Sequence, residues 1–176
     1  MRKTLAIIFT FLIVATLTIG LVACGGTNSN GSSKSSNDSN SSSSSLSPRE
    51  KFESEMSTPV TCNGVSFRYN KSNDKVEFYH FESISGMSVT IAGDFKPSYY
   101  ADGSVKIVDG SYTWLYRLDV AKYSSNHSAR MILSSGDSRM ESLLVGSSIK
   151  TKICDNIAQA FDDYYNYVLV HTGYEL

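Results

Sequence analysis

The sequence lacks the short motifs that mark most enzyme active sites. It has no Gly-x-Ser-x-Gly elbow, no His-Glu-x-x-His helix, no phosphate-binding loop and no Gly-x-Gly-x-x-Gly turn. Ser72-Asn73-Asp74-Lys75 and Ser147-Ser148-Ile149-Lys150 match the Ser-x-x-Lys motif of penicillin-recognising enzymes, but the partner motif Lys-Thr-Gly is missing. Chance matches are expected in a sequence this rich in serine. The sequence therefore predicts a protein without catalytic activity.

An excess of charge of one sign is also missing. The 176 residues carry 16 basic and 17 acidic side chains, which provides no basic patch of the kind that nucleic-acid binding needs. The three histidines are far apart and have no paired spacing for zinc. We expect His80 to pack among aromatic residues in a strand and His127 to be solvated in a polar turn. No metal, cofactor or nucleic-acid partner is predicted.

Cysteine is scarce, with only Cys24, Cys62 and Cys154 in the chain. A disulfide between Cys62 and Cys154 would close a loop of roughly 90 residues and contribute about 4–5 kcal/mol in the chain-entropy treatment. Two buried thiols that pack as small apolar groups are the alternative. The sequence does not decide between them, because it does not show whether the two Cα atoms come within bonding range.

What the sequence does contain is a distinctive N-terminus. Arg2 and Lys3 precede an apolar run from Leu5 to Ile19, which leads to Leu21-Val22-Ala23-Cys24. This stretch resembles the lipobox of bacterial lipoproteins, in which a diacylglyceryl group is attached to the cysteine sulfur and the preceding peptide is removed. The resemblance implies a signal peptide over residues 1–23. It also implies that lipidated Cys24 anchors the protein to the extracytoplasmic face of the cell membrane. A secretory signal without lipid and a transmembrane helix are the alternatives.

Residues 24–48 are dominated by Ser, Asn and Gly, including the unbroken run Ser41 to Ser45. Such a segment has almost nothing to bury, so the composition predicts a disordered tether between the anchor and a folded domain over residues 49–176. Flexible-linker scaling gives it a root-mean-square reach of about 25–30 Å. A tether of this kind indicates a Gram-positive organism.

The rest of the chain has the pattern of one α+β domain. Ser47, Pro48 and Glu50 have the spacing of a capping box, which predicts a short helix over residues 49–56. Asp109-Gly110 between alternating apolar runs predicts a hairpin, and Asp102-Gly103 predicts a further turn. Alternating or apolar runs predict strands over residues 65–69, 75–81, 87–91, 105–108, 112–120 and 130–133, and a last one over 140–145.

Near residue 149 the spacing of the apolar residues changes from strand-like alternation to a helical period. One helical stripe is formed by Ile149, Ile153, Ile157, Phe161, Tyr164 and Val168. Ser147 or Ser148 can cap its start and Gly173 suits its end. Asp155, Asp162 and Asp163 lie off the stripe and are expected to face water. The pattern therefore predicts an antiparallel sheet of about six to seven strands packed against a C-terminal amphipathic helix.

Gly64-Val65-Ser66-Phe67, the Val108-Asp109-Gly110-Ser111-Tyr112 hairpin and the final helix resemble small bacterial lipoprotein domains of the PsbP-like (photosystem II extrinsic-subunit) architecture. The resemblance implies an antiparallel sheet between helices, used mostly in binding and assembly. No site residue can be transferred from it.

Tyrosine is the aromatic residue in excess, with eleven in the chain against eight phenylalanines and one tryptophan. Either the tyrosines line the core, or some of them form a binding surface, for which the loop with Tyr99, Tyr100 and Asp102 is the best candidate. We expect a non-catalytic binding module that recognises an envelope protein, peptide or glycan. One alternative is an envelope hydrolase with a site assembled from distant residues, which a deep pocket with His80 or His127 next to a carboxylate would favour. The other is an immunity or superinfection-exclusion lipoprotein.

Overall fold

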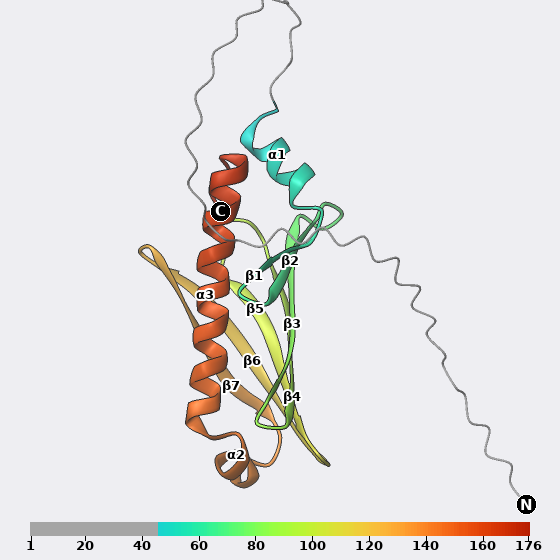
Figure 1. The fold of residues 1–176 in the computed structure, drawn as a ribbon, viewed down its shortest axis with the longest axis vertical. Coiled ribbons are helices and arrows are strands. Elements are labelled where there is room, and N and C mark those ends of the chain that lie inside the picture. Colours follow the sequence, from blue (N-terminus) through green and yellow to red (C-terminus); the bar gives the residue numbers. More distant parts are fainter. Residues whose placement is uncertain (1–45) are drawn as a thin grey trace, which may run out of the picture.

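Seven antiparallel strands form one sheet, and a single long helix lies across one of its faces (Figure 1). The structure is a computed structural model that describes residues 46–176. Each strand pairs with the next along the chain, so the order in the sheet is β1 to β7. The elements are α1 (Pro48–Glu55), β1 (Val60–Cys62), β2 (Val65–Asn70), β3 (Lys75–Ile84), β4 (Met87–Phe95), β5 (Ala101–Asp109), β6 (Tyr112–Tyr123), β7 (Asn126–Ser135), α2 (Ser138–Leu144) and α3 (Gly146–Thr172).

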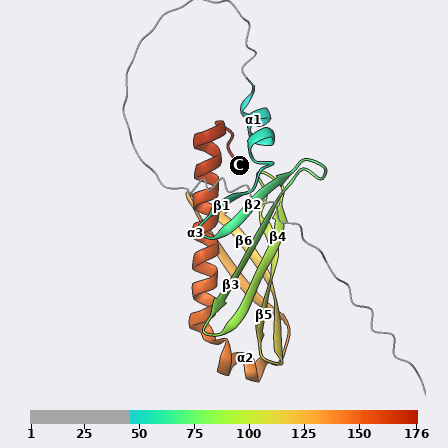
Figure 2. The ribbon, with the colours of Figure 1, turned by 45° about the vertical axis from the view of Figure 1, so that its right-hand side comes forward.

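The predicted α+β class, an antiparallel sheet of about six to seven strands against a C-terminal helix, is confirmed by the seven-stranded sheet and α3. Figure 2 shows α3 on one side of the curved sheet, with the opposite face of the sheet uncovered by any helix. The predicted signal peptide, the lipobox with Cys24 and nearly all of the tether lie outside the described residues.

Helix α1 begins as its sequence predicts. The Ser47 hydroxyl accepts a hydrogen bond from the Glu50 backbone N–H, and the Glu50 carboxylate accepts one from the Ser47 backbone N–H at 2.8 Å. Pro48 occupies the first helical position, where no N–H donor is needed. Phe52 is fully buried and attaches the helix to the domain.

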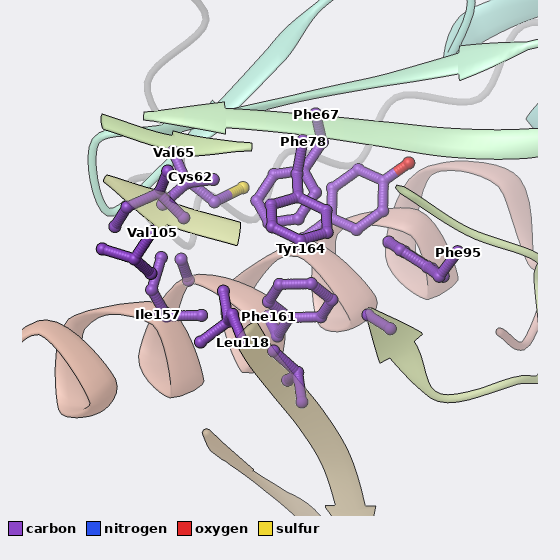
Figure 3. Close-up of a cluster of buried hydrophobic side chains, with 14 of the residues drawn as sticks. Cys62, Val65, Phe67, Phe78, Phe95, Val105, Leu118, Ile157, Phe161 and Tyr164 are labelled. Carbon is purple, nitrogen blue, oxygen red and sulfur yellow. The ribbon is translucent and has the colours of Figure 1, made fainter. Parts of the chain in front are cut away.

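Aromatic rings from both layers form the centre of the core (Figure 3). Phe161 of α3 meets Phe67 of β2 and Phe78 of β3 edge-on, each at 5.2 Å between ring centroids. Tyr164, one turn further along α3, stacks on Phe67 at 4.3 Å. These edge-to-face and stacked contacts fix how the helix is rotated on the sheet, because they require particular ring orientations.

The predicted turn at Asp102-Gly103 is wrong, because both residues lie inside β5. Glycine is needed at position 103 because neighbouring strands pack too closely against it to leave room for a side chain. A Cβ on Gly103 would lie 2.9 Å from both the Ala92 carbonyl oxygen and the Phe78 ring. The Phe78 ring therefore uses the space that a side chain would otherwise fill. The chain reverses earlier, between Phe95 and Ala101.

The predicted strand over residues 140–145 is also wrong, because this segment forms helix α2. The Asp137 carboxylate caps the helix by accepting hydrogen bonds from the backbone N–H groups of Arg139 and Met140. Inside α2, the buried Glu141 carboxylate accepts from the Tyr116 hydroxyl at 3.1 Å and from Lys150 Nζ at 2.8 Å. These partners satisfy a charge that would be costly to bury alone.

Helix α3 begins at Gly146, directly after α2. Gly146 has a φ of 58°, which lets the chain change direction between the two helices. Ser147 and Ser148 therefore lie inside the first turn instead of capping it. The predicted end is confirmed: Gly173 is the C-cap in the left-handed conformation, with φ 71°.

The two domain cysteines do not form a disulfide. Cys62 is buried in β1, at one edge of the sheet, whereas the Cys154 sulfur accepts a hydrogen bond from the backbone of Met131 in β7, at the opposite edge. Burial raises the pKa of the Cys154 thiol above its usual value.

Candidate functional site

Two adjoining hollows lie between the β4–β5 turn, the β6–β7 hairpin and the C-terminal half of α3. Their volumes are about 180 Å³ and about 380 Å³. Both are lined by Lys122, Tyr165 and the C-terminal Leu176, so they form one site, which we call the tyrosine cavity. The smaller hollow is completed by Ser125, His127, Asp162, Asn166, Leu169 and Glu175, and the larger one by Ser98, Tyr99, Tyr100 and Ser124.

The two predicted loop tyrosines line this cavity. Tyr99 and Tyr100 lie in the β4–β5 turn, and each is 71 % exposed. Beneath them, burial raises the pKa of the Tyr165 hydroxyl to about 12. Lys122 Nζ lies 5.0 Å from the centroid of the Tyr165 ring, within the range of a cation–π contact. The cavity thus offers aromatic surface together with one cation.

Asp102, the third predicted binding residue, is not part of the cavity. It lies in β5 next to the buried Ala101 and is therefore on the opposite, uncovered face of the sheet. Its cross-strand neighbours are Asp94 of β4 and Asp119 of β6. Arg117 and Arg130 neutralise Asp119 at 2.9 Å and 2.8 Å. Asp102 therefore belongs to an acidic row on the uncovered face, separate from Tyr99 and Tyr100.

The most unusual polar contact in the cavity joins His127 of β7 to Asp162 of α3. The Asp162 carboxylate accepts from the His127 backbone N–H and from the ring Nδ1, each at 2.7 Å. The expectations for both residues were wrong, because the His127 side chain is only 4 % exposed and Asp162 faces the sheet. Burial lowers the pKa of His127 below its usual value, and this outweighs the opposing effect of the Asp162 hydrogen bond.

This contact also protects the edge of the sheet. Strand β7 has a neighbour on one side only, and its outer N–H groups would otherwise be unpaired. Asp162 and Cys154, eight residues apart on α3, accept hydrogen bonds from the backbone of His127 and Met131. One face of α3 therefore covers part of the free edge of β7.

The chemistry open to His127 is limited by its surroundings. A carboxylate only accepts, so Nδ1 carries the proton and Nε2 is the free acceptor. Nε2 is enclosed by protein and has no hydrogen-bond partner within residues 46–176. The imidazole packs edge-on against Tyr165 at 4.4 Å between centroids. The pair is thus a histidine held in one tautomer, whose free nitrogen does not reach the cavity surface.

His80, the other histidine considered, is held in the sheet. Its Nδ1 lies 2.7 Å from the Gly64 carbonyl oxygen, and its Nε2 lies 3.4 Å from the Glu82 carboxylate. The side chain is 12 % exposed, which agrees with the predicted packed position. It ties β3 to the β1–β2 turn.

Sequence reasoning missed Lys122, Tyr165 and Leu176, which come together only in the folded domain. It also missed the contact of Asp162 with the sheet, for which the sequence does contain a signal. Cys154, Ala158 and Asp162 are spaced four residues apart, which places them on one face of the helix beside the apolar stripe. A polar residue in that row indicates contact with another element and argues against full solvation.

Within residues 46–176, no group of three or more His, Cys, Asp or Glu side chains is placed to hold a metal ion. None of the helices in this part of the chain combines the length and hydrophobicity needed to cross a membrane. Comparison with protein-family models, curated proteins and solved structures found no match.

Proposed function

We propose that this protein is a lipid-anchored, non-catalytic binding module on the extracytoplasmic face of a bacterial cell membrane. In this proposal residues 1–23 are a lipoprotein signal peptide, Cys24 carries the diacylglyceryl anchor, and the tyrosine cavity is the binding surface. The partner is a component of the membrane or envelope: a lipid, protein, peptide or glycan.

The tyrosine cavity is the observation that carries the proposal. Loop tyrosines that are 71 % exposed beside a hollow of about 380 Å³ are typical of a recognition surface, because a rigid ring with a polar tip gives contact area at little cost in conformational entropy. The shared Lys122 adds a positive charge that can orient a ligand. No step of this function requires a reactive group.

In-cell crosslinking of the tagged protein in its own host, followed by mass spectrometry, tests the proposal. Tyr99→Ala/Tyr100→Ala should remove the recovered partner while leaving the fold intact. Tyr79→Ala/Phe81→Ala is the matched control, since it removes an equally aromatic, exposed pair from the uncovered sheet face.

The anchor has its own test. Cys24→Ala should abolish lipid labelling and release the protein from the membrane fraction. Unchanged mass, labelling and fractionation would refute the anchor. Recovery of the same partner by the double-tyrosine variant would instead remove the cavity as the binding surface.

A second candidate function is an envelope hydrolase, and the His127–Asp162 contact at 2.7 Å is the observation that favours it. A carboxylate that orients a histidine is the arrangement used in general-base catalysis. Because the free Nε2 of His127 is enclosed by protein, this function also requires a movement that exposes it to the substrate. The purified protein should then hydrolyse ester or amide substrates with activity that His127→Gln removes. Equal residual activity of the two proteins would exclude His127 as a general base.

A further inference from the structure

The described chain begins beside the C-terminal end of α3. The Arg49 guanidinium donates to the Tyr174 hydroxyl at 3.0 Å, and the Phe52 and Tyr174 rings stack at 4.9 Å. Pro48 lies next to the helix cap, since a Cβ on Gly173 would be 3.9 Å from its ring. Figures 1 and 2 show α1 and the end of α3 together, with α2 at the other end of the domain. The segment that leads back to Cys24 therefore enters the domain at this end.

Exposed apolar side chains gather at the same end. Tyr99 and Tyr100 line the cavity together with the terminal Leu176, and Leu169, which is 49 % exposed, lines it from α3. Tyr123, 67 % exposed, lies between two cavity residues at the tip of the β6–β7 hairpin. We call Tyr99, Tyr100, Tyr123 and Leu169 the apolar rim. The β4–β5 turn, the β6–β7 hairpin and α3 all contribute to the rim, so it forms only when the domain is folded.

We infer that the apolar rim docks on the outer leaflet of the membrane that holds the anchor. The inference rests on the proposed lipid anchor at Cys24 and narrows the partner of the tyrosine cavity to the bilayer itself. Tyrosine is well suited to this place, because its ring is apolar and its hydroxyl remains hydrated at the headgroup level.

The position of the anchor favours this occupant over others. The tether predicted from the sequence would reach about 25–30 Å, less than the length of about 40 Å that 27 helical residues give α3. The end of the domain at which the chain enters is therefore the end nearest the bilayer. A rim at that end meets lipid at a raised effective concentration, because the anchor makes the encounter intramolecular.

Charge distinguishes the rim from the other exposed aromatic surface. Lys122 lies in the cavity and Lys96 precedes the tyrosines in the β4–β5 turn, whereas Asp162 and Glu175 are the carboxylates that line the cavity. Lysines near anionic lipid contribute about 1 kcal/mol each. The uncovered sheet face has Tyr79 and Phe81, but the cations beside its row of carboxylates are already ion-paired. Arg68 pairs with Glu77, Lys75 with Asp94, and both Arg117 and Arg130 with Asp119.

A fluorescence experiment on the full lipoprotein tests the docking. The chain has one tryptophan, Trp114, which is fully buried and gives a constant background. The variant Tyr99→Trp and the matched control Tyr79→Trp each add one exposed indole. Both are purified with the lipid attached and reconstituted in vesicles of phosphatidylglycerol and phosphatidylcholine that carry bromine on the acyl chains.

Quenching by the brominated lipid should be at least about twofold stronger for Tyr99→Trp than for Tyr79→Trp, because docked apolar side chains lie at the headgroup–acyl boundary. Equal quenching of the two variants, or stronger quenching of Tyr79→Trp, would overturn the docking and leave a protein, peptide or glycan as occupant of the rim. Protein that lacks the diacylglyceryl mass and does not float with the vesicles would overturn the proposed anchor, and the docking with it.

Discussion

Replacing Asp162 by alanine tests whether α3 stabilises the free edge of the sheet. The substitution removes one acceptor and leaves both the His127 backbone N–H and its ring Nδ1–H without a partner. Hydrogen bonds to a charged group contribute about 1.5–3 kcal/mol each, and the Asp162 side chain is 26 % exposed. We therefore use the lower limit and expect Asp162→Ala to reduce the free energy of unfolding by about 3 kcal/mol.

The neighbouring aspartate provides the control. Asp163 accepts only an exposed hydrogen bond from the Gln159 side chain within the same helix, so Asp163→Ala should change the unfolding free energy by less than about 0.5 kcal/mol. Asp162→Asn keeps an acceptor oxygen without the charge and should cost about 1.5 kcal/mol, half of the alanine effect, since charge-assisted hydrogen bonds are roughly twice as strong as neutral ones.

Urea unfolding gives the three free energies, and hydrogen exchange reports the His127 amide directly. That amide should exchange faster in Asp162→Ala than in Asp163→Ala. If the two alanine variants unfold within about 0.5 kcal/mol of each other, the contact does not stabilise the edge and the argument fails.

Three further outcomes are expected. Burial lowers the pKa of folded His127 below 6.5, so the unfolded chain takes up the proton first and stability should fall as pH drops below about 6.5. His127→Gln should flatten that part of a urea-midpoint profile, and identical slopes would contradict this. Gly103→Ala should cost about 1–3 kcal/mol through overpacking, against almost nothing for Ser104→Ala. Tyr164→Phe should stabilise by about 1 kcal/mol, because its buried hydroxyl has no partner within residues 46–176; destabilisation in a thermal melt would show that one exists.

The features that local physics controls could be predicted from the sequence. The Ser47–Glu50 capping box, the Asp109-Gly110 hairpin and the Gly173 cap depend on residues a few positions apart. The helical stripe from Ile149 to Val168 follows from a single period, so the helix and its buried face were predictable together.

Long-range contacts decided the rest. Glycine at position 103 has the local signature of a turn, and only the Phe78 ring from another strand explains its place inside β5. Residues 140–145 became helical because the Asp137 cap and the partners of Glu141 favour a helix over a weak strand pattern.

The candidate site shows the same division. Sequence alone determined that Tyr99 and Tyr100 were candidates for a binding surface, because tyrosine chemistry is a property of the residue. Only the tertiary structure brought them to Lys122, Tyr165 and Leu176 and separated them from Asp102. Strand alternation sends neighbouring residues to opposite faces, so Asp102 points away from its buried neighbour Ala101 and lies on the far side of the sheet from the cavity. The cavity itself exists because the end of α3 and two turns of the sheet meet there, and that depends on how the aromatic core orients the helix.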